Sequence, residues 1–591
     1  MCGIVGYIGK KENTLNVLIN GLKHLEYRGY DSSGVAYILN NKLIIKKAPG
    51  RINNLEDKLN FTDLSNIGIG HTRWATHGKA NEINSHPHRC KNIAIVHNGI
   101  IENYLDIKNN LIKKGYKFKS ETDTEVAAVL LYDLYKDTGN VITAIIKFKE
   151  LVTGSYAIAL ICDKEPDSLY VIKKNSPLII GLGDNANYVA SDMPAIVDYT
   201  KKYITLADNE FAKITKDNIS LYDKNNKEIN YEVKTFIGSS NEMDKGIYEH
   251  YMLKEIYEEA DVIRRTCMDI NLPNISNYKK IIIVACGSAM HAGLVGANLI
   301  EKYACIPVKV EIASEFRYKK LFLDSDTLVI AISQSGETAD TLEAVKIAKT
   351  YGSHTLGIIN VIGSSIAREV DEVIYTKAGS EIAVATTKAY LAQVMVLSIL
   401  AYLSRKDTKL PEIKNYEKDL KKLPNIIEKI LKREKEYQQI AKYIYQNKDI
   451  FYIGRGIDYA ICMEASLKIK EISYLHSEAY PAGELKHGTI SLIEEGTPVI
   501  GLVTDHEIAT KTISNLKEVK SRGANVIYIT TDKLQIDGDF YNERLIIPDI
   551  NPLLEPIVSI IPLQLIAYHT AKLNKCDIDK PKNLAKSVTV E

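Results

Sequence analysis

The sequence lacks several features that would restrict its class. It contains one tryptophan in 591 residues, and no two of its eight cysteines form a Cys-x-x-Cys pair. This scatter excludes a regular disulfide framework and favours reduced thiols. Lys and Arg (75) nearly balance Asp and Glu (74), and no Lys/Arg-rich block stands out. Composition therefore gives no indication of a nucleic-acid partner.

Long hydrophobic runs are also missing. The most apolar stretch, Ala389 to Leu403, is shorter than a bilayer span and contains Gln393, so we interpret it as a buried helix. The start of the chain lacks the basic segment and following apolar segment of a secretory signal. We expect a cytoplasmic protein that does not bind membranes.

The length of the chain predicts about three or four folding units. Over residues 1–238, short β-rich runs alternate with turns and helical segments, which predicts an α+β domain with layered sheets. The polar stretch 239–247 is typical of a linker. After it, apolar runs of strand length alternate with helical segments, which indicates α/β doubly wound parallel sheets.

The α/β pattern occurs twice, at an offset of about 170 residues. Ile281–Gly287 is similar to Ile450–Gly456, and Thr327–Ile330 is similar to Thr497–Ile500. Two copies of one unit are therefore expected after the linker. The expected boundaries are 248–425 for the first copy, 426–575 for the second, and 576–591 for a polar tail that by default is frayed.

One loop carries residue types that bind metals, namely His86, His88 and Cys90. A second cluster of ligands is missing from the sequence pattern. A polar loop is therefore the better interpretation, and neither a metal nor another cofactor is expected.

The amino terminus offers a candidate nucleophile. Removal of Met1 would leave Cys2 with a thiol and a free α-amine on one carbon. Their reference pKa values, about 8.5 and roughly 7.7 to 8.0, are close enough for the amine to act as a base. By itself, however, Met-Cys-Gly is more typical of the simple start of a strand.

Two further segments favour the nucleophile. Arg73 has a guanidinium suited to gripping a carboxylate, and a strand ends in Asn98-Gly99, whose amide and N–H could face a developing oxyanion. A surface arginine and a hairpin turn are the ordinary alternatives.

A resemblance to a known family decides between these alternatives. The blocks that carry it are Cys2-Gly3-Ile4, Tyr27 to Ser32, His71 to Gly78, His97-Asn98-Gly99 and Ser120 to Glu125. In this order they resemble the glutaminase domain of amino-terminal-nucleophile (class II) glutamine amidotransferases. The resemblance implies that Cys2 is the nucleophile and that Asn98 and the Gly99 N–H form the oxyanion hole. It also implies glutamine-binding roles for Arg73, Thr76, His77 and Asp123, with Trp74 as an ammonia gate.

In the first α/β copy, a hydroxyl-rich loop follows a buried strand. Ser333 to Thr338 precedes the helical run Ala339 to Tyr351, which places hydroxyls and backbone N–H groups at a helix amino terminus. An ordinary helix cap needs only one such hydroxyl. A phosphate cradle is therefore the favoured interpretation.

In the second copy, Glu464, Lys468 and Glu471 follow one another at helical spacing, so one helical face carries acid, base and acid. Spacing alone favours a solvated, salt-bridged face. His487, in the loop that follows, could move protons near neutral pH, although a single loop histidine is usually unremarkable.

The part after the linker resembles sugar-isomerase (SIS) domains, and the whole chain resembles the isomerising glutamine:fructose-6-phosphate aminotransferase (glucosamine-6-phosphate synthase) family. The blocks are Ser333 to Thr341, Gly379 to Lys388, Glu464 to Tyr474, Gly483 to Gly488 and Asn583 to Glu591. The last of these makes the tail part of the sugar site. The resemblance implies phosphate binding by Ser288, Ser333, Gln334, Ser335 and Thr338, sugar contacts from Val384, Thr386, Glu464, Lys468 and Ala585, ring opening by His487, a Schiff base on Lys586, and proton transfer between C1 and C2 by Glu471.

One position departs from the family pattern. Cys286-Gly287-Ser288-Ala289 stands where the family commonly has Gly-Thr-Ser. Ser288 keeps a hydroxyl and Ala289 lacks one, which weakens the expectation of one phosphate contact.

The resemblance implies an enzyme that hydrolyses L-glutamine and transfers the ammonia to D-fructose 6-phosphate, giving D-glucosamine 6-phosphate at the start of hexosamine biosynthesis. It implies a homodimer. A different amidotransferase, with a nucleotide-dependent synthetase or a phosphoribosyl transferase, is disfavoured, because no Gly-x-x-x-x-Gly-Lys-Ser/Thr loop is present and two SIS-like copies fill the rest of the chain. A non-catalytic sugar-phosphate sensor would not need Cys2, His487, Glu471 and Lys586 together.

Overall fold

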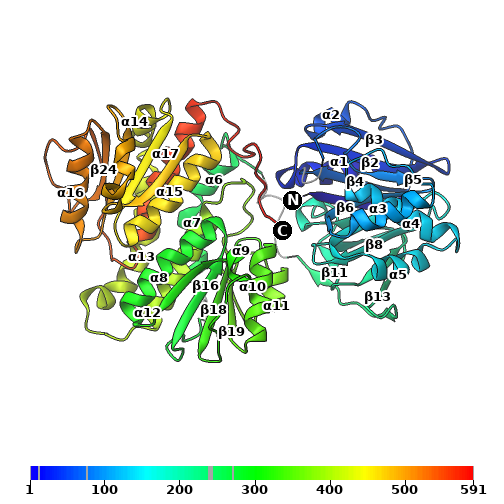
Figure 1. The fold of residues 1–591 in the computed structure, drawn as a ribbon, viewed down its shortest axis with the longest axis horizontal. Helices are drawn as coiled ribbons and strands as arrows, with labels where there is room; N and C mark the ends of the chain where they lie inside the picture. Colours follow the sequence, from blue (N-terminus) through cyan, green and yellow to red (C-terminus); the bar gives the residue numbers. More distant parts are fainter. Residues whose placement is uncertain (1, 11–13, 75–77, 237–243, 269–271, 590–591) are drawn as a thin grey trace. The chain divides into compact units, whose positions relative to one another are not determined.

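The computed structural model describes residues 2–10, 14–74, 78–236, 244–268 and 272–589 (Figure 1). The chain forms two compact units. One contains the residues up to 244 together with those from 585 onward, and the other contains residues 245–584. Among the described residues, no helix is long and apolar enough to cross a membrane.

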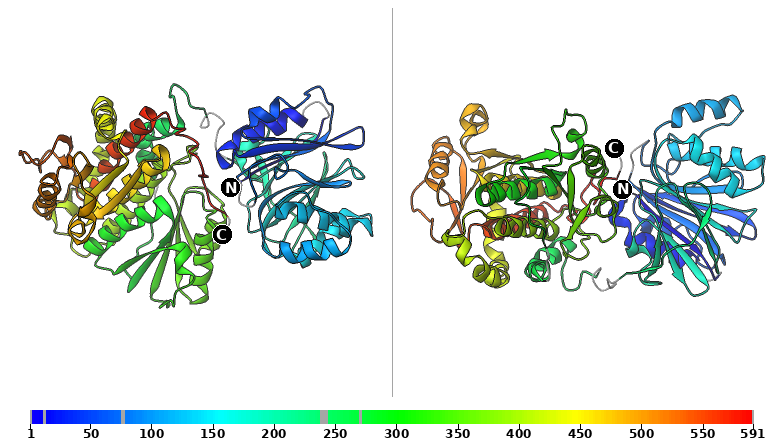
Figure 2. Two further views of the ribbon diagram at one scale, coloured as in Figure 1. Left: turned by 45° about the horizontal axis from the view of Figure 1, so that its top comes forward. Right: turned by 90° about the horizontal axis from the view of Figure 1, so that it is seen from below.

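Two antiparallel sheets form the body of the first unit (Figure 2). In spatial order the first sheet contains β15 (Lys234–Thr235), β11 (Lys202–Thr205), β9 (Ile179–Gly183), β10 (Ala186–Ala190), β1 (Gly3–Ile8), β4 (Ile67–Arg73), β2 (Ser32–Leu39) and β3 (Lys42–Pro49). The second contains β14 (Glu228–Ile229), β13 (Ile219–Tyr222), β12 (Phe211–Ile214), β8 (Leu169–Lys174), β7 (Gly154–Cys162), β6 (Ile93–Ile101) and β5 (His88–Cys90).

Successive side chains of β1 point to opposite faces of its sheet, as strand geometry requires. Ile4 belongs to the core between the two sheets, and Val5 belongs to the core beneath the helices. Both faces of β1 are thus buried, which explains its continuous apolar sequence. The helices of this unit are α1 (Thr14–His24), α2 (Ile52–Glu56), α3 (Tyr104–Lys113), α4 (Asp123–Lys136) and α5 (Val141–Leu151). The predicted layered α+β domain is confirmed.

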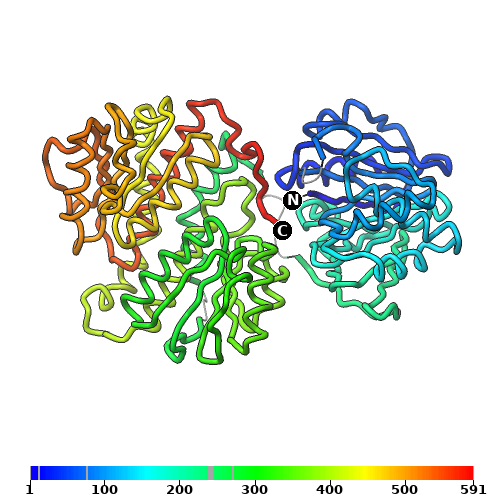
Figure 3. Tube along the Cα trace, viewed as in Figure 1, coloured from blue at the N-terminus to red at the C-terminus, as the bar shows by residue number. Residues whose placement is uncertain are grey.

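Residues 245–584 contain two parallel five-stranded sheets with the same strand order, so the predicted repeat is confirmed. In Figure 3 the first copy is mainly green and the second runs from yellow to red. The first sheet is ordered β17 (Val308–Ile312), β16 (Lys280–Ala285), β18 (Thr327–Ser333), β19 (His354–Ile359) and β20 (Glu372–Tyr375). The second is ordered β22 (His476–Pro481), β21 (Asp449–Gly454), β23 (Pro498–Val503), β24 (Asn525–Thr531) and β25 (Glu543–Ile547).

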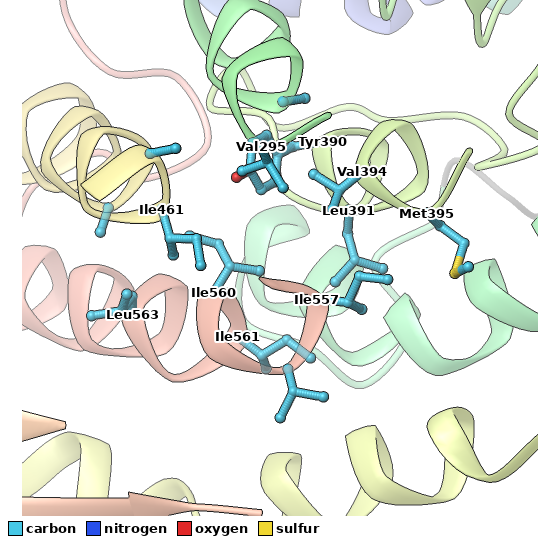
Figure 4. Close-up of a cluster of buried hydrophobic side chains, with 14 of the residues drawn as sticks. Val295, Tyr390, Leu391, Val394, Met395, Ile461, Ile557, Ile560, Ile561 and Leu563 are labelled. Carbon is cyan, nitrogen blue, oxygen red and sulfur yellow. The ribbon is translucent and has the colours of Figure 1, made fainter. Parts of the chain in front are cut away.

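Four helices pack where the two copies meet: α8 (Gly287–Ala304), α12 (Lys388–Leu403), α15 (Ile457–Ser473) and α17 (Glu555–Leu573). Figure 4 shows Val295, Tyr390, Ile461 and Ile560 of these helices close together in one apolar cluster. The predicted buried helix is α12, whose residues are almost all buried. The other helices of this unit are α6 (Tyr251–Tyr257), α7 (Glu259–Cys267), α9 (Ala313–Phe316), α10 (Ala339–Thr350), α11 (Ser365–Glu369), α13 (Pro411–Leu431), α14 (Glu434–Ile444) and α16 (Ala509–Lys520).

Two expected boundaries can be placed on this fold. The position between residues 425 and 426 falls inside α13, so a continuous helix crosses it. Most of the expected linker lies outside the described residues. The default of a frayed tail is wrong, because Ser587 and Thr589 are each only 7% exposed.

Candidate active sites

Strand register places Cys2 beside Trp74. β1 begins directly after Cys2 and runs antiparallel to β4, with Gly3 opposite Thr72. The Trp74 N–H donates to Cys2 Sγ at 3.3 Å. Burial raises the pKa of the Cys2 thiol, and the chain's amino terminus, the Trp74 N–H and the Arg73 charge offset only part of that rise. A base that removes the thiol proton is therefore needed near neutral pH.

Asn98 and Gly99 lie in β6 of the facing sheet. The Asn98 Nδ2 donates to the carbonyl oxygen of Cys2 at 2.8 Å, which joins the two sheets at the nucleophile. Gly99 has φ +125°, and a Cβ there would lie 2.1 Å from the Ser155 carbonyl oxygen. Only glycine fits this position, so the backbone N–H of residue 99 is not shielded by a side chain of its own.

His71 fixes which way the Asn98 amide points. Its Nε2 lies 3.0 Å from the His97 carbonyl oxygen and 3.0 Å from Asn98 Oδ1. A carbonyl oxygen can only accept, so His71 Nε2 carries a proton and donates it to both oxygens. This leaves the Asn98 Nδ2 on the side of Cys2. Burial lowers the pKa of His71 to about 3, so the ring stays neutral and keeps this role at ordinary pH.

A replacement of His71 tests this arrangement. His71→Phe should lower kcat for glutamine hydrolysis, the activity that the resemblance implies, by about 10- to 100-fold with little change in KM, because the amide predicted to stabilise the oxyanion is then misoriented. His71→Gln should recover much of the loss, because its amide N–H can donate to the same oxygens. Both constants are measured by glutamate release, and an unchanged kcat in a folded His71→Phe protein would contradict the role.

His71 belongs to a buried group of imidazoles. Its ring lies 4.1 Å from that of His86, which lies 5.2 Å from that of His88. Burial lowers the pKa of His86 and His88 well below the ordinary value. The His88 Nε2 bonds to the Thr122 hydroxyl at 3.0 Å. These histidines therefore pack and bond behind the candidate oxyanion hole.

Asp123 is positioned by a helix cap. The Thr122 side chain accepts from the Glu125 N–H and caps α4, so Asp123 occupies the first turn. Asp123 is 5% exposed, and its carboxylate accepts from the Ile101 N–H at 2.9 Å. Arg73 ends β4 and is 3% exposed. The predicted glutamine ligands Thr76 and His77 lie outside the described residues.

The hydroxyl-rich loop lies at the carboxyl edge of the first parallel sheet. Ser333 ends β18, and Ser288 lies in the first turn of α8, directly after the neighbouring strand β16. Strand order reverses between these two strands, which is where ligands of open α/β sheets bind. Ala289, which departs from the family pattern, is half-buried in the same turn.

Thr338 is the amino-terminal cap residue of α10, but its side chain makes no cap bond. Its hydroxyl lies 3.0 Å from the Ser333 hydroxyl, which also accepts from the Gly336 N–H at 3.0 Å. The Ser335 hydroxyl accepts from the Glu337 N–H at 3.2 Å, and Gln334 is half-buried in the same loop. The hydroxyls are thus held within the loop, and the phosphate cradle stays a prediction.

Two buried carboxylates hold the loop that contains Val384 and Thr386. Glu381 accepts from the Thr386 hydroxyl at 2.6 Å and from the Thr387 N–H at 3.0 Å. Glu255, in α6, accepts from the Ala383 N–H at 3.2 Å. Neither glutamate was a predicted site residue. Glu381 lies inside a matching sequence block, but its structural role could not be inferred from that.

The loop is also tied to the segment before the tail. The Val384 N–H donates to the carbonyl oxygen of Asp579 at 3.0 Å. The Asp579 carboxylate accepts from the N–H groups of Tyr251 and Met252, the first residues of α6, at 3.0 Å each. One aspartate therefore links the loop that contains Val384 and Thr386 (the predicted sugar loop), the first helix after the linker and the approach to the tail.

Of the acid, base and acid of α15, Glu464 and Lys468 are buried and the Glu471 side chain is 20% exposed, so the solvated-face interpretation is wrong. The side chains of Glu464 and Lys468 are each 1% exposed. Lys468 Nζ lies 3.4 Å from Glu464 Oε1 and 2.5 Å from Glu471 Oε2. Burial alone would lower the pKa of Lys468, but the two carboxylates outweigh it and raise that pKa. Lys468 is therefore a charged ion-pair partner.

The remaining predicted residues lie in other segments. His487 ends a short 3-10 helix, Glu484–His487, and is exposed. Ala585 and Lys586 are half-buried in the last part of the tail, which from residue 585 onward is grouped with the first unit.

Comparisons with known proteins cover the whole chain. The sequence profile of the glutamine amidotransferase domain matches residues 55–251, and that of the SIS domain matches residues 274–403 and 443–573. A glutamine–fructose-6-phosphate aminotransferase (isomerizing) of Clostridium tetani is 49% identical, and one of Thermococcus kodakarensis is 44% identical, each over 100% of both chains.

A solved structure agrees with this. The C-terminal domain of glucosamine-fructose-6-phosphate aminotransferase from Francisella tularensis is 39% identical and superposes with a TM-score of 0.54, over 57% of this chain and 100% of that one. Sequence and fold lead to one family: this chain belongs to the isomerizing glutamine–fructose-6-phosphate aminotransferases.

Proposed function

We propose that the chain hydrolyses L-glutamine and transfers the released ammonia to D-fructose 6-phosphate, forming L-glutamate and D-glucosamine 6-phosphate. The enzyme is an aminotransferase of amino-sugar metabolism. The observation that carries this function is the full-length similarity to enzymes of that name. The buried Cys2–Asn98 contact in one unit and the α15 carboxylates in the other supply chemistry suited to the two half-reactions.

In the glutaminase half, Arg73 binds the α-carboxylate of glutamine and Asp123 its α-ammonium group. The Cys2 thiolate attacks the side-chain amide carbon, and Asn98 Nδ2 with the Gly99 N–H stabilises the oxyanion. Collapse of the intermediate expels ammonia and leaves a thioester. Water then hydrolyses the thioester to glutamate and restores the thiol. Thr76 and His77 are further ligands of glutamine in this proposal.

In the sugar half, the loop hydroxyls and helix amino termini of the first copy bind the phosphate. His487 assists ring opening, Lys586 forms a Schiff base with the C2 ketone, and ammonia replaces the lysine. Glu471 removes a proton from C1 and returns one to C2. The proposed phosphate and sugar ligands are Ser288, Ser333, Gln334, Ser335, Thr338, Val384, Thr386, Glu464, Lys468 and Ala585.

The two halves depend on each other, since ammonia is a nucleophile only when it is unprotonated. We propose that Trp74 is the gate that keeps the released ammonia from being lost to water as ammonium. The Trp74 backbone contact with Cys2 supports this assignment, because the gate residue then adjoins the place where ammonia is released. We further propose that the enzyme is a cytoplasmic homodimer without a cofactor.

Isotope transfer tests the function. Glutamine labelled with ¹⁵N at the side-chain amide should give glucosamine 6-phosphate that carries the label, as measured by mass spectrometry. Unlabelled product, or glutamate release without any amino sugar in the presence of fructose 6-phosphate, would exclude the proposed transfer.

A further inference from the structure

A histidine of the first SIS copy contacts the carboxylate cluster of the second. His291 lies in α8, one turn after Ser288, and α8 packs against α15. Its Nδ1 lies 2.8 Å from Glu464 Oε2. The side chain of His291 is 10% exposed and that of Glu464 is 1% exposed. Both partners are thus withdrawn from water. A charged hydrogen bond is stronger in such a buried place than in water.

The contact extends the cluster to four groups. Glu464 uses Oε2 for His291 and presents Oε1 to Lys468 at 3.4 Å, and Lys468 reaches Glu471 at 2.5 Å. Two carboxylates and one ammonium leave a net charge of −1 in a buried place. A hydrogen bond donated by His291 to Glu464 offsets part of the free-energy cost of burying that charge.

Other titratable groups of the described residues also act on Glu464 and its neighbours. From α12, the buried Tyr390 phenol lies near enough for the Glu464 charge to raise its pKa, a rise due mainly to burial. From the sugar loop, Glu381 adds to the field at Lys468. Lys468 and Glu471 lie on α15, the same helix as Glu464. Among these groups His291 is the only one on α8, the helix whose first turn carries Ser288.

We propose that His291 is a positioning residue for proton transfer by Glu471, acting through Glu464 and Lys468. This inference rests on the proposed function of the sugar half. By donating from Nδ1–H, His291 holds the Glu464 carboxylate beside Lys468, so Lys468 is shared between two carboxylates. Glu471 then remains basic enough to remove the C1 proton. The helix that contributes Ser288 to the phosphate cradle thereby also tunes the base.

The consequence of losing this donor has a definite sign. Without this donor, the Glu464 carboxylate is no longer held beside Lys468. Lys468 then turns its full charge toward Glu471, which favours the carboxylate form and lowers the pKa of Glu471. The acid limb of the kcat profile therefore moves to lower pH, and the plateau rate falls because the base is weaker.

The test compares His291→Phe, which keeps the volume but removes the donor, with His291→Gln, which keeps an N–H. We expect His291→Phe to lower kcat for glucosamine 6-phosphate by about 10-fold and to move the acid limb down by about one pH unit. KM for fructose 6-phosphate should change by a smaller factor than kcat. The kinetic isotope effect with [1-²H]fructose 6-phosphate should rise, because C1–H cleavage becomes slower. His291→Gln should restore most of the rate.

His569→Phe is a matched control, because it removes another buried histidine, whose Nε2 lies 3.3 Å from Glu434 Oε1 on α14. It should leave the isotope effect and the pH profile unchanged. A folded His291→Phe enzyme with wild-type profile and isotope effect would overturn the proposal. An equal loss of kcat in His291→Phe and His291→Gln without a larger isotope effect would also overturn the proposal. Such a result would indicate that His291 acts only through its packing.

Failure of this proposal can be told from failure of the proposed function. Wild-type enzyme is assayed first, and absence of glucosamine 6-phosphate there concerns the function itself. Glutamine hydrolysis without sugar is measured for every variant, and should match wild type, because His291 lies outside the glutaminase unit. Thermal unfolding identifies variants that do not fold.

Discussion

Cys2→Ala is expected to lower glutamine hydrolysis by at least about 10⁴-fold, as removal of a nucleophile does in other enzymes that form covalent intermediates. In the proposed mechanism the Cys2 thiol forms the thioester, and Asn98 Nδ2 donates to the carbonyl oxygen of this residue. Synthesis of glucosamine 6-phosphate from added ammonium salt at alkaline pH should persist, because the sugar half keeps all its residues.

A second thiol in the same unit provides the control. Cys90 is half-buried in β5, and burial raises its pKa to about 11. An electrophilic glutamine analogue should label wild-type enzyme and Cys90→Ala once per chain, and should not label Cys2→Ala. Intact-mass measurement of the same samples shows whether Met1 is absent. Full glutaminase activity in chains that retain Met1 would contradict the role of the α-amine as the base.

Lys586→Ala is expected to abolish the adduct that borohydride traps with fructose 6-phosphate, and to lower synthesis by at least about 10³-fold. A Schiff base forms only from a neutral primary amine. Two buried lysines of the second unit are poor alternatives. Lys468 is held between two carboxylates that raise its pKa, and Lys388 Nζ lies 2.7 Å from Glu258. Both are therefore engaged as charged partners.

Lys586→Arg is the informative companion. It keeps the positive charge of the tail but cannot form an imine, so it should fail in the trapping assay as Lys586→Ala does. Peptide mapping of the trapped wild-type adduct should locate the sugar on Lys586. An adduct that survives in both variants, or that maps to Lys468, would move the Schiff base to another lysine.

The repeat and the motif blocks could be predicted from the sequence because each depends on residues that are close together in the chain. Strand-length apolar runs recur at a fixed offset, and the structure has two sheets of the same strand order. The block from Ser120 to Glu125 matches the family pattern as a sequence alone. The structure explains part of this block, because Thr122 caps the helix whose first turn contains Asp123.

The α15 cluster shows where local reasoning fails. Helical spacing places Glu464, Lys468 and Glu471 on one face but does not say what covers that face. Such spacing favours a solvated face. Packing of α8 against α15 covers Glu464 instead, and the packing of these helices depends on apolar residues far away in the sequence.

By itself the sequence determined the order of the domains, the repeat, and which residues are the candidate nucleophile, phosphate ligands and bases. These features are written in neighbouring residues and in the periods of strands and helices. The tertiary structure alone decided that His71 orients Asn98, that Glu255 and Glu381 hold the sugar loop, and that His291 reaches Glu464. Such contacts join residues as many as 173 positions apart, so they exist only once side chains of separate elements pack together.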